Sequence, residues 1–128
     1  MNFLSKYNDE TYALLRIVSG AIFTFHGVQK VLGVMTEHQP AIGTQLWLGG
    51  MIELICGILI VVGFQVRWAA FLASGTMAVA YIQFHWNFQF GPEFFPAING
   101  GDGAILYSLI FLHIACRGAG KWSLSKNE

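Results

Sequence analysis

Four long apolar segments constrain the fold of this chain more than any other feature. They cover residues 12–32, 42–64, 68–84 and 103–116. The first two reach the length of about 20 residues that an α-helix needs to cross the hydrocarbon of a bilayer, and the last two are shorter. The pattern predicts one domain over residues 1–128: an all-α integral membrane four-helix bundle with an aromatic-rich loop between helices three and four.

The chain has too few polar residues to cover a soluble globule. Charged residues make up 11% of it and hydrophobic residues 55%, whereas a soluble domain carries about 25% charged residues. The formal net charge is zero and no cluster of basic residues occurs, which argues against a nucleic-acid partner. Cys56 and Cys116 lie far apart in apolar segments, so we expect packed core thiols and no metal site. Arg16 interrupts the first segment, so we expect that segment to be retained and not cleaved as a signal peptide.

Lysine and arginine are distributed unevenly between the two ends of the predicted helices. With the N-terminus inside, only Lys30 lies at an outer end. The inner ends hold Lys6, Arg16, Arg67, Arg117, Lys121 and Lys126. This bias predicts that both termini are cytoplasmic and that the aromatic loop, residues 86–101, lies on the outer side.

Polar residues of the first two segments are predicted to meet inside the bundle. Arg16, His26 and Lys30 share a helical arc of roughly 100°, which should avoid lipid. Lys30 has a second interpretation, in which its stem carries the ammonium to the outer headgroups. Glu53 lies near the middle of segment two, where an ionised carboxylate is costly, so it is either protonated or paired with a cation. We expect a polar partner from segment one, and depth along the helix makes His26 the nearest.

Glycines beside Glu53 indicate that a neighbouring helix comes close. Gly49, Gly50 and Gly57 flank the carboxylate and should form a small-residue face. Glu53 would then lie at a helix–helix contact. It is either part of a functional site or an interhelical strut that only holds the helices together.

His85 and Asp102 extend the set of inward-facing groups. His85 continues the small-residue stripe of Ala70, Ser74 and Ala78, so it should point inward at the outer end. Asp102 lies in the first turn of the fourth helix, where capping and a functional role are equal alternatives. The aromatic residues between them are expected to anchor the loop at the membrane interface, or else to line the mouth of a hydrophobic site.

The order of these residues resembles that of the DoxX family of small four-helix membrane proteins. The matching positions are Arg16, His26-Gly27 with Lys30, Gly49-Gly50 with Glu53 and Gly57, Asn99-Gly100-Gly101-Asp102, and Lys121-Trp122-Ser123-Leu124. Asp102 stands where the family often has glutamate. The resemblance implies a prokaryotic cytoplasmic (inner) membrane protein. It also implies kinship with subunits of thiosulfate:quinone oxidoreductase and with relatives that associate with soluble redox proteins.

Two classes of function follow. The first is a subunit of, or accessory to, a quinone-linked redox system, with His26 and Glu53 as catalytic groups and Lys30, His85 and Asp102 contacting the bound head group. The sequence has no flavin motif, iron–sulfur cysteine set or CxxC, so electrons would come from a partner protein. Haem is disfavoured because His85 lies shallower than His26. The second class is a non-catalytic membrane anchor, assembly factor or small-ligand-binding subunit, whose buried charges specify helix pairing. In both classes the chain contacts the lipid bilayer, as a monomer or a homo-oligomer.

Overall fold

The computed structural model describes residues 2–125, and within that range the chain is helical without β-strands. Four long helices are present: α1 (Asn8–Leu32), α2 (Gln45–Val62), α3 (Val66–Ala80) and α5 (Asp102–Arg117). Shorter elements are the 3-10 turns η1 (Ser5–Tyr7) and η3 (Pro92–Phe94), the π-helical turn η2 (Tyr81–Trp86) and the single turn α4 (Pro96–Asn99). The predicted all-α bundle architecture is confirmed.

The long helices end at residues whose backbone conformation stops a helix. α1 is followed by Gly33 (φ 67°) and α2 by Gly63 (φ 75°), a left-handed conformation that glycine adopts without steric cost. α2 begins after Thr44, whose hydroxyl oxygen accepts a hydrogen bond from the Trp47 N–H group at 3.3 Å. The observed bounds lie within four residues of the predicted ones, and the predicted third segment changes from α-helix to π-helix after Ala80.

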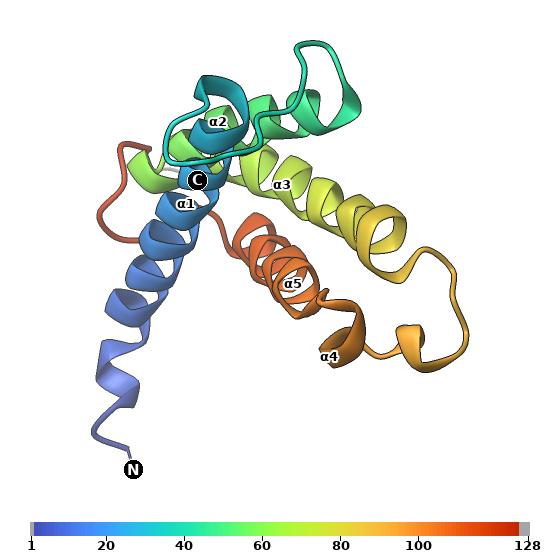
Figure 1. The fold of residues 1–128 in the computed structure, drawn as a ribbon. Helices are drawn as coiled ribbons and strands as arrows, with labels where there is room; N and C mark the ends of the chain where they lie inside the picture. Colours follow the sequence, from blue (N-terminus) through green and yellow to red (C-terminus); the bar gives the residue numbers. More distant parts are fainter. Residues whose placement is uncertain (1, 126–128) are drawn as a thin grey trace.

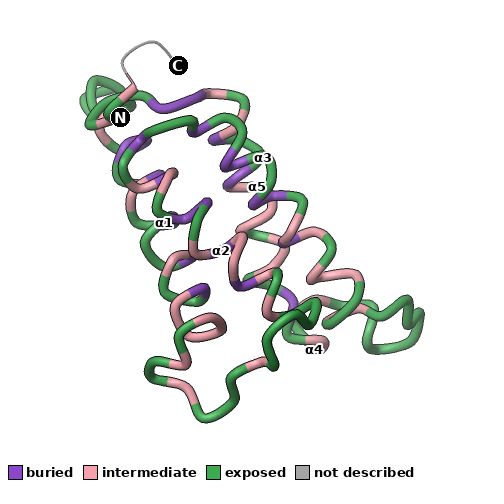
Figure 2. The backbone as a smooth tube through the Cα atoms, turned by 90° about the horizontal axis from the view of Figure 1, so that it is seen from above, coloured by how far each residue is buried: buried purple, intermediate pink, exposed green. Residues whose placement is uncertain are grey.

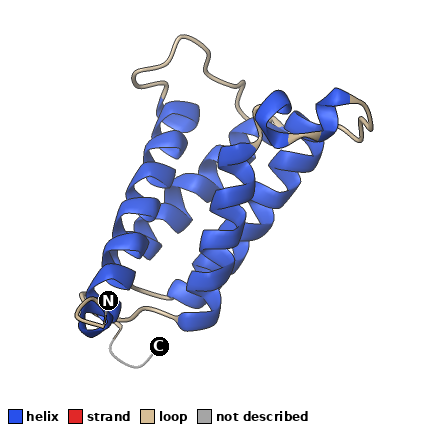
Figure 3. Cartoon of the chain, turned by 90° about the horizontal axis from the view of Figure 1, so that it is seen from below, coloured by secondary structure: helices blue, strands red, loops and turns tan. Residues whose placement is uncertain are grey.

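The long helices pack as two pairs joined through α2 and α3. α1 lies against α2, α3 lies against α5, and α1 makes few contacts with α5. Figure 1 shows α3 and α5 side by side, with α1 set apart from α5. The first and last residues that the structure describes lie at one end of the bundle and long loops at the other (Figure 3). We call these the terminal end (residues 2–7, 63–65 and 118–125) and the loop end (residues 33–44 and 87–101).

Glycines allow the close approach of α1 and α2. A Cβ atom on Gly27 would meet the backbone of α2, including the Gly50 carbonyl oxygen at 2.8 Å, and a Cβ on Gly57 would meet Thr24. The predicted small-residue face is therefore present at Gly50 and Gly57. Gly49 differs, since a Cβ there would have no heavy atom within 4 Å. Adjacent residues of a helix point about 100° apart, so Gly49 is turned away from α1.

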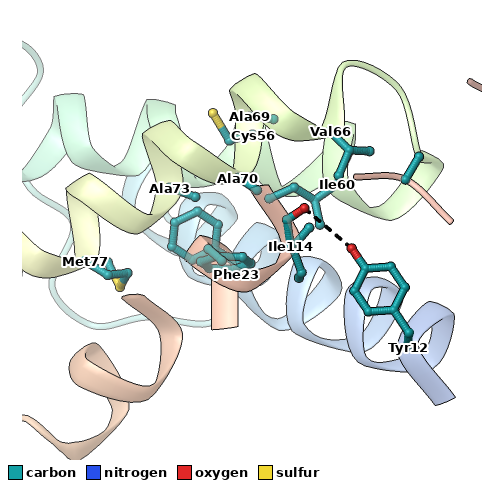
Figure 4. Close-up of a cluster of buried hydrophobic side chains, with 12 residues drawn as sticks. Tyr12, Phe23, Cys56, Ile60, Val66, Ala69, Ala70, Ala73, Met77 and Ile114 are labelled. Carbon is teal, nitrogen blue, oxygen red and sulfur yellow. Dashed lines mark hydrogen bonds between the residues drawn. The ribbon is translucent and has the colours of Figure 1, made fainter. Parts of the chain in front are cut away.

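The buried core is narrow and lies where the helix pairs meet. Phe23, Ile60, Met77 and Ile114 lie close together there, and the ring centroids of Phe23 and Phe111 are 4.7 Å apart (Figure 4). Large apolar side chains also cover the outside of the bundle: Leu14, Phe71 and Leu109 are 51%, 62% and 58% exposed. Exposed residues follow the helices along much of their length (Figure 2). An apolar exterior of this extent is typical of a surface that meets lipid.

Two helical stretches, Ser5–Leu32 and Gln45–Val62, are long and apolar enough to cross a membrane. Only 39% and 28% of their most apolar windows are buried inside the chain. α3 and α5 have 15 and 16 residues and are shorter than the hydrocarbon requires. A helix that is too short is accommodated by local thinning of the bilayer or by flanking side chains that reach the headgroups, and α3 is lengthened by the adjoining η2.

Arg16 joins distant parts of the chain at the terminal end. The residue is completely buried. Its terminal nitrogens donate to four backbone carbonyls, those of Ile60 (2.5 Å), Val61 (2.9 Å), Lys121 (2.9 Å) and Trp122 (2.7 Å). The first two belong to the last turn of α2, where carbonyls lack intrahelical donors and the helix dipole is negative. Arg16 thus caps α2 and holds residues 121–125 against it, and it does not pair with Glu53.

Other basic residues also gather at the terminal end. Arg67 donates to the carbonyls that end α5, those of Ala115 (3.0 Å), Cys116 (2.5 Å) and Arg117 (3.2 Å). Arg117 pairs with Asp9 and Lys121 with Glu10, each at 2.6 Å. The hydrogen bond that Lys121 donates to the Glu10 carboxylate raises the pKa of the Lys121 ammonium. Lys126 lies outside the described residues.

The two cysteines differ in their surroundings. Cys56 is buried in the core, as expected, but Cys116 is exposed. The expectation of a core thiol is wrong for Cys116. It lies in the last turn of α5, where the helix no longer packs closely on a neighbour on that side.

Candidate functional site

A cavity of about 330 Å³ lies between the helices in the half of the bundle towards the loop end. It brings together four of the polar residues singled out in the sequence: His26, Lys30, Glu53 and His85. They come from α1, α2 and η2. Its apolar lining includes Phe23, Leu46, Met77, Phe84 and Tyr107. Such a mixture of a few polar groups and a mainly apolar wall is typical of sites that bind small organic molecules.

The strongest polar contact in this cavity is an ion pair between α1 and α2. The Nζ atom of Lys30 lies 2.6 Å from Oε1 of Glu53. The Glu53 side chain is 3% exposed and that of Lys30 is 32% exposed. Gly50 makes room for the lysine stem, since a Cβ there would lie 2.5 Å from Cβ of Lys30.

Glu53 therefore has a partner from the first helix, as predicted, but the partner is Lys30 and not His26. By the depth of its Cα atom along α1, His26 was expected to lie nearer to Glu53 than Lys30 does. Helical side chains point back towards the N-terminus, and the long lysine stem reaches down from the next turn. That direction brings the Lys30 ammonium to the level of the carboxylate.

The second carboxylate oxygen of Glu53 lacks a partner. Oε2 is buried and accepts no hydrogen bond from the described residues. Buried polar atoms in folded proteins are nearly always hydrogen-bonded, because an unpaired one costs about 1–3 kcal/mol. An ionised carboxylate also accepts several hydrogen bonds at once. This oxygen can therefore receive a donor from a bound molecule.

The two histidines lie on different parts of the cavity wall. His26 is exposed on α1, and His85 is half-buried in η2. Nδ1 of His85 lies 3.3 Å from the Asn99 carbonyl oxygen. A carbonyl only accepts hydrogen bonds, so Nδ1 is the donor and Nε2 is left for other contacts. The π-helical geometry changes the direction in which the side chain leaves the helix, and π-turns are frequent at functional sites.

Comparison with known proteins identifies the group to which this arrangement belongs. The model of the DoxX family matches residues 11–86, which run from α1 through η2 and include all four polar residues of the cavity. The chain belongs to the DoxX family. A relative from Haemophilus influenzae, described as an uncharacterized protein, is 42% identical over 128 residues, which cover 97% of this chain and 95% of the relative. No solved structure matches the chain. Membership of the family, together with the apolar exterior, makes this a membrane-associated helical bundle.

Asp102 lies outside the cavity of this DoxX protein and outside the segment that the family model matches. It is exposed at the first position of α5, next to Gly101, which makes no side-chain cap. Gly103, the following residue, lines the cavity, and the angle of about 100° between neighbours turns Asp102 away. Its contact with a bound head group stays a prediction, and Asp102 is left out of the site proposed below. Its carboxylate still favours the positive end of the helix dipole.

The Asn99-Gly100-Gly101 segment orders the loop beside His85. The Asn99 side chain accepts a hydrogen bond from the Gly101 N–H group at 2.8 Å and donates to the Glu93 carbonyl at 2.9 Å. A Cβ on Gly101 would strike the ring of Tyr81. These contacts hold the Asn99 carbonyl where His85 reaches it.

The aromatic rings of the loop in this DoxX protein pack on one another and do not line the cavity, to which the loop contributes only Gly100. Trp86 is the centre of the cluster, with ring centroids 5.1 Å from Phe88, 5.5 Å from Phe90 and 5.9 Å from Phe94. Phe88 and Phe90 are 62% and 78% exposed. The geometry favours the first alternative, that these rings anchor the loop at the membrane interface. The aromatic walls of the cavity come instead from Phe23, Phe84 and Tyr107, which no sequence pattern separates from ordinary core residues.

Proposed function

We propose that this DoxX protein binds the head group of a quinone in the cavity at Glu53, as part of a membrane redox system. The observation that carries the proposal is that the Glu53 carboxylate is buried and only half paired. Its Oε1 atom accepts a hydrogen bond from Lys30, its Oε2 atom has no donor among the described residues, and two histidines line the same cavity. A quinol hydroxyl would donate to the free oxygen. The remaining N–H donors of Lys30 suit a quinone carbonyl.

The residues present also suit the proton transfers that accompany quinone chemistry. Reduction of a quinone to a quinol takes up electrons and protons in equal number. The electrons would come from an electron-donating partner protein, since the sequence contains no flavin or iron–sulfur motif. His26 lines the cavity, and an imidazole can accept and release a proton, so His26 can pass a proton towards the head group.

Replacement of His26 by glutamine tests the proposal. Glutamine keeps a polar side chain but takes up no proton near neutral pH. We expect His26→Gln to retain roughly tenfold less quinone per folded protein after mild-detergent purification, because a neutral amide replaces the charged donor that a protonated histidine offers to the head group. The measurement is extraction of the purified protein and quantification of quinone by absorbance.

His113→Gln is the matched control, because His113 is exposed on α5 and does not line the cavity. It should retain as much quinone as the parent. Equal retention by His26→Gln and the parent would show that His26 is structural. A parent that holds no quinone would favour the second function class, an anchor, assembly factor or ligand-binding subunit in which the Lys30–Glu53 pair only joins α1 and α2.

The proposal also includes an orientation in the prokaryotic inner membrane. Arg16, Arg67, Arg117 and Lys121 gather at the terminal end, while Lys30 lies towards the loop end. Positively charged residues are enriched on the cytoplasmic side of membrane proteins. The terminal end would then be cytoplasmic, and the cavity would open in the outer half of the bilayer.

Single cysteines in a Cys56→Ser, Cys116→Ser background test this orientation. Ser5 and Glu37 are exposed at opposite ends of the bundle. In spheroplasts, whose cytoplasmic membrane is intact, a membrane-impermeant thiol reagent should label Glu37→Cys. It should label Ser5→Cys only after permeabilisation. The reverse pattern would invert the proposed topology.

A further inference from the structure

A second cavity adjoins the one at Glu53 and opens through the side of the bundle. It has a volume of about 400 Å³ and lies between α2 and α3. Glu53, Met77, Ala80 and Phe84 line both cavities. Its other walls are almost entirely apolar, including Leu48, Phe71, Leu72 and Val79, whose side chains are about half exposed or more. The cavity is therefore an apolar groove that runs from the buried carboxylate to the lipid-facing surface.

Two glycines keep this groove open. Gly49 on α2 and Gly75 on α3 both line it, and a Cβ atom on either would have no heavy atom within 4 Å. Neither glycine is needed for close helix packing, unlike Gly27 and Gly57. Glycine in the interior of a helix is less stable than alanine. At Gly49 and Gly75 the missing side chain leaves the space of the groove free.

We propose that the groove between α2 and α3 holds the long apolar tail of the molecule whose polar head lies beside Glu53. This inference rests on the proposed quinone site and adds the class of ligand: a lipid-soluble quinone with a long isoprenoid tail, which enters sideways from the bilayer. The buried, unpartnered Oε2 atom belongs to the residue that lines both cavities. When the head group of a quinone contacts this oxygen, its tail can therefore extend through the groove to the surface of the bundle.

A third cavity, of about 560 Å³ between α1 and α5, offers a different exit. It shares only Gly103 and Tyr107 with the cavity at Glu53, and Glu53 itself does not line it. A tail in that cavity would leave the head group past Gly103 and Tyr107, and not past the carboxylate. The shared carboxylate thus favours the α2–α3 groove, and the two exits can be separated by mutation.

The experiment compares two quinones with the same head group, one with a long isoprenoid tail and one with a methyl group in its place. Both are bound to the purified full chain in lipid nanodiscs, and their dissociation constants are measured by competition. The parent should bind the tailed quinone at least tenfold more tightly. Gly75→Leu fills the groove and should bring this ratio close to one, while its affinity for the methyl quinone stays unchanged.

Val18→Trp is the matched control, because Val18 lines the α1–α5 cavity and tryptophan adds a comparable volume there. It should keep the ratio of the parent. The inference is overturned if Gly75→Leu keeps the ratio or if Val18→Trp abolishes it. It is also overturned if the parent binds both quinones equally, in which case the proposed function stands. Binding of neither quinone by the parent refutes the proposed function and this inference together. Thermal unfolding of both variants verifies that they are folded.

Discussion

Replacing Arg16 by alanine is expected to abolish the accumulation of folded protein. The guanidinium donates to four backbone carbonyls in a fully buried position. Without it, one buried carbonyl oxygen, that of Ile60, and three part-buried ones would lose their donors, and each unpaired buried group costs about 1–3 kcal/mol. The sum is comparable to the whole stability of a typical domain, about 5–15 kcal/mol. The measurement is the yield and the free energy of unfolding of the protein in mild detergent.

Arg67→Ala is the matched control for this prediction. Arg67 also donates to three carbonyls at the end of a helix, but its side chain is exposed, so water can replace it. We expect a loss of about 1 kcal/mol or less. Arg16→Lys should behave more like Arg16→Ala, because one ammonium cannot span the acceptors that the planar guanidinium reaches. Equal losses for Arg16→Ala and Arg67→Ala would contradict the role assigned to burial.

Replacing Lys30 is expected to lower the free energy of unfolding more than replacing Glu53, although both changes break the same ion pair. Lys30→Met leaves a carboxylate that is 3% exposed, whereas Glu53→Leu leaves an ammonium on a flexible stem that is 32% exposed. A stranded buried charge costs about 3–5 kcal/mol. The lysine can instead turn towards water or headgroups, so the loss for Glu53→Leu should be smaller.

The double variant Lys30→Met, Glu53→Leu separates these effects. It removes both charges and should recover much of the stability that Lys30→Met loses, because apolar replacements of a buried pair are often neutral. All variants are compared by denaturant or thermal unfolding in the same detergent. If the two single variants lose the same stability, the difference in exposure does not control the cost of breaking the pair.

Periodicity identified the groups that meet in the cavity but not the contacts that they make. The periodicity of the helices predicted that His26, Lys30, Glu53 and His85 face the bundle interior. In the structure all four line one cavity. The choice of His26 as the partner of Glu53 failed because it used Cα depth and ignored the reach of the lysine stem. A helical wheel gives direction only, so it contains no information on side-chain length.

The roles of Arg16 and Asp102 show what a sequence pattern leaves out. The acceptors of Arg16 are main-chain carbonyls up to 106 residues away, and a carbonyl is present at every residue, so no residue type marks them. Asp102 was predicted to contact a bound head group from the first turn of the fourth helix, and the structure leaves it out of the cavity lining without testing that contact. A helix start fixes depth well, but a small rotation decides whether the first residue faces inward or outward.

The position of residues 121–125 has a consequence for biosynthesis. This segment follows all the helices, yet it supplies two of the four oxygens that Arg16 holds, and its N–H groups bond to Val62 and Gly63. During translation, α1 therefore enters the membrane with a cation whose partners have not all been made. A ribosome that stops before residue 121 would release a chain with all its long helices, in which Arg16 keeps only the Ile60 and Val61 carbonyls as acceptors. Such a chain is expected to be less stable than the full-length protein, because a buried guanidinium with missing acceptors is costly.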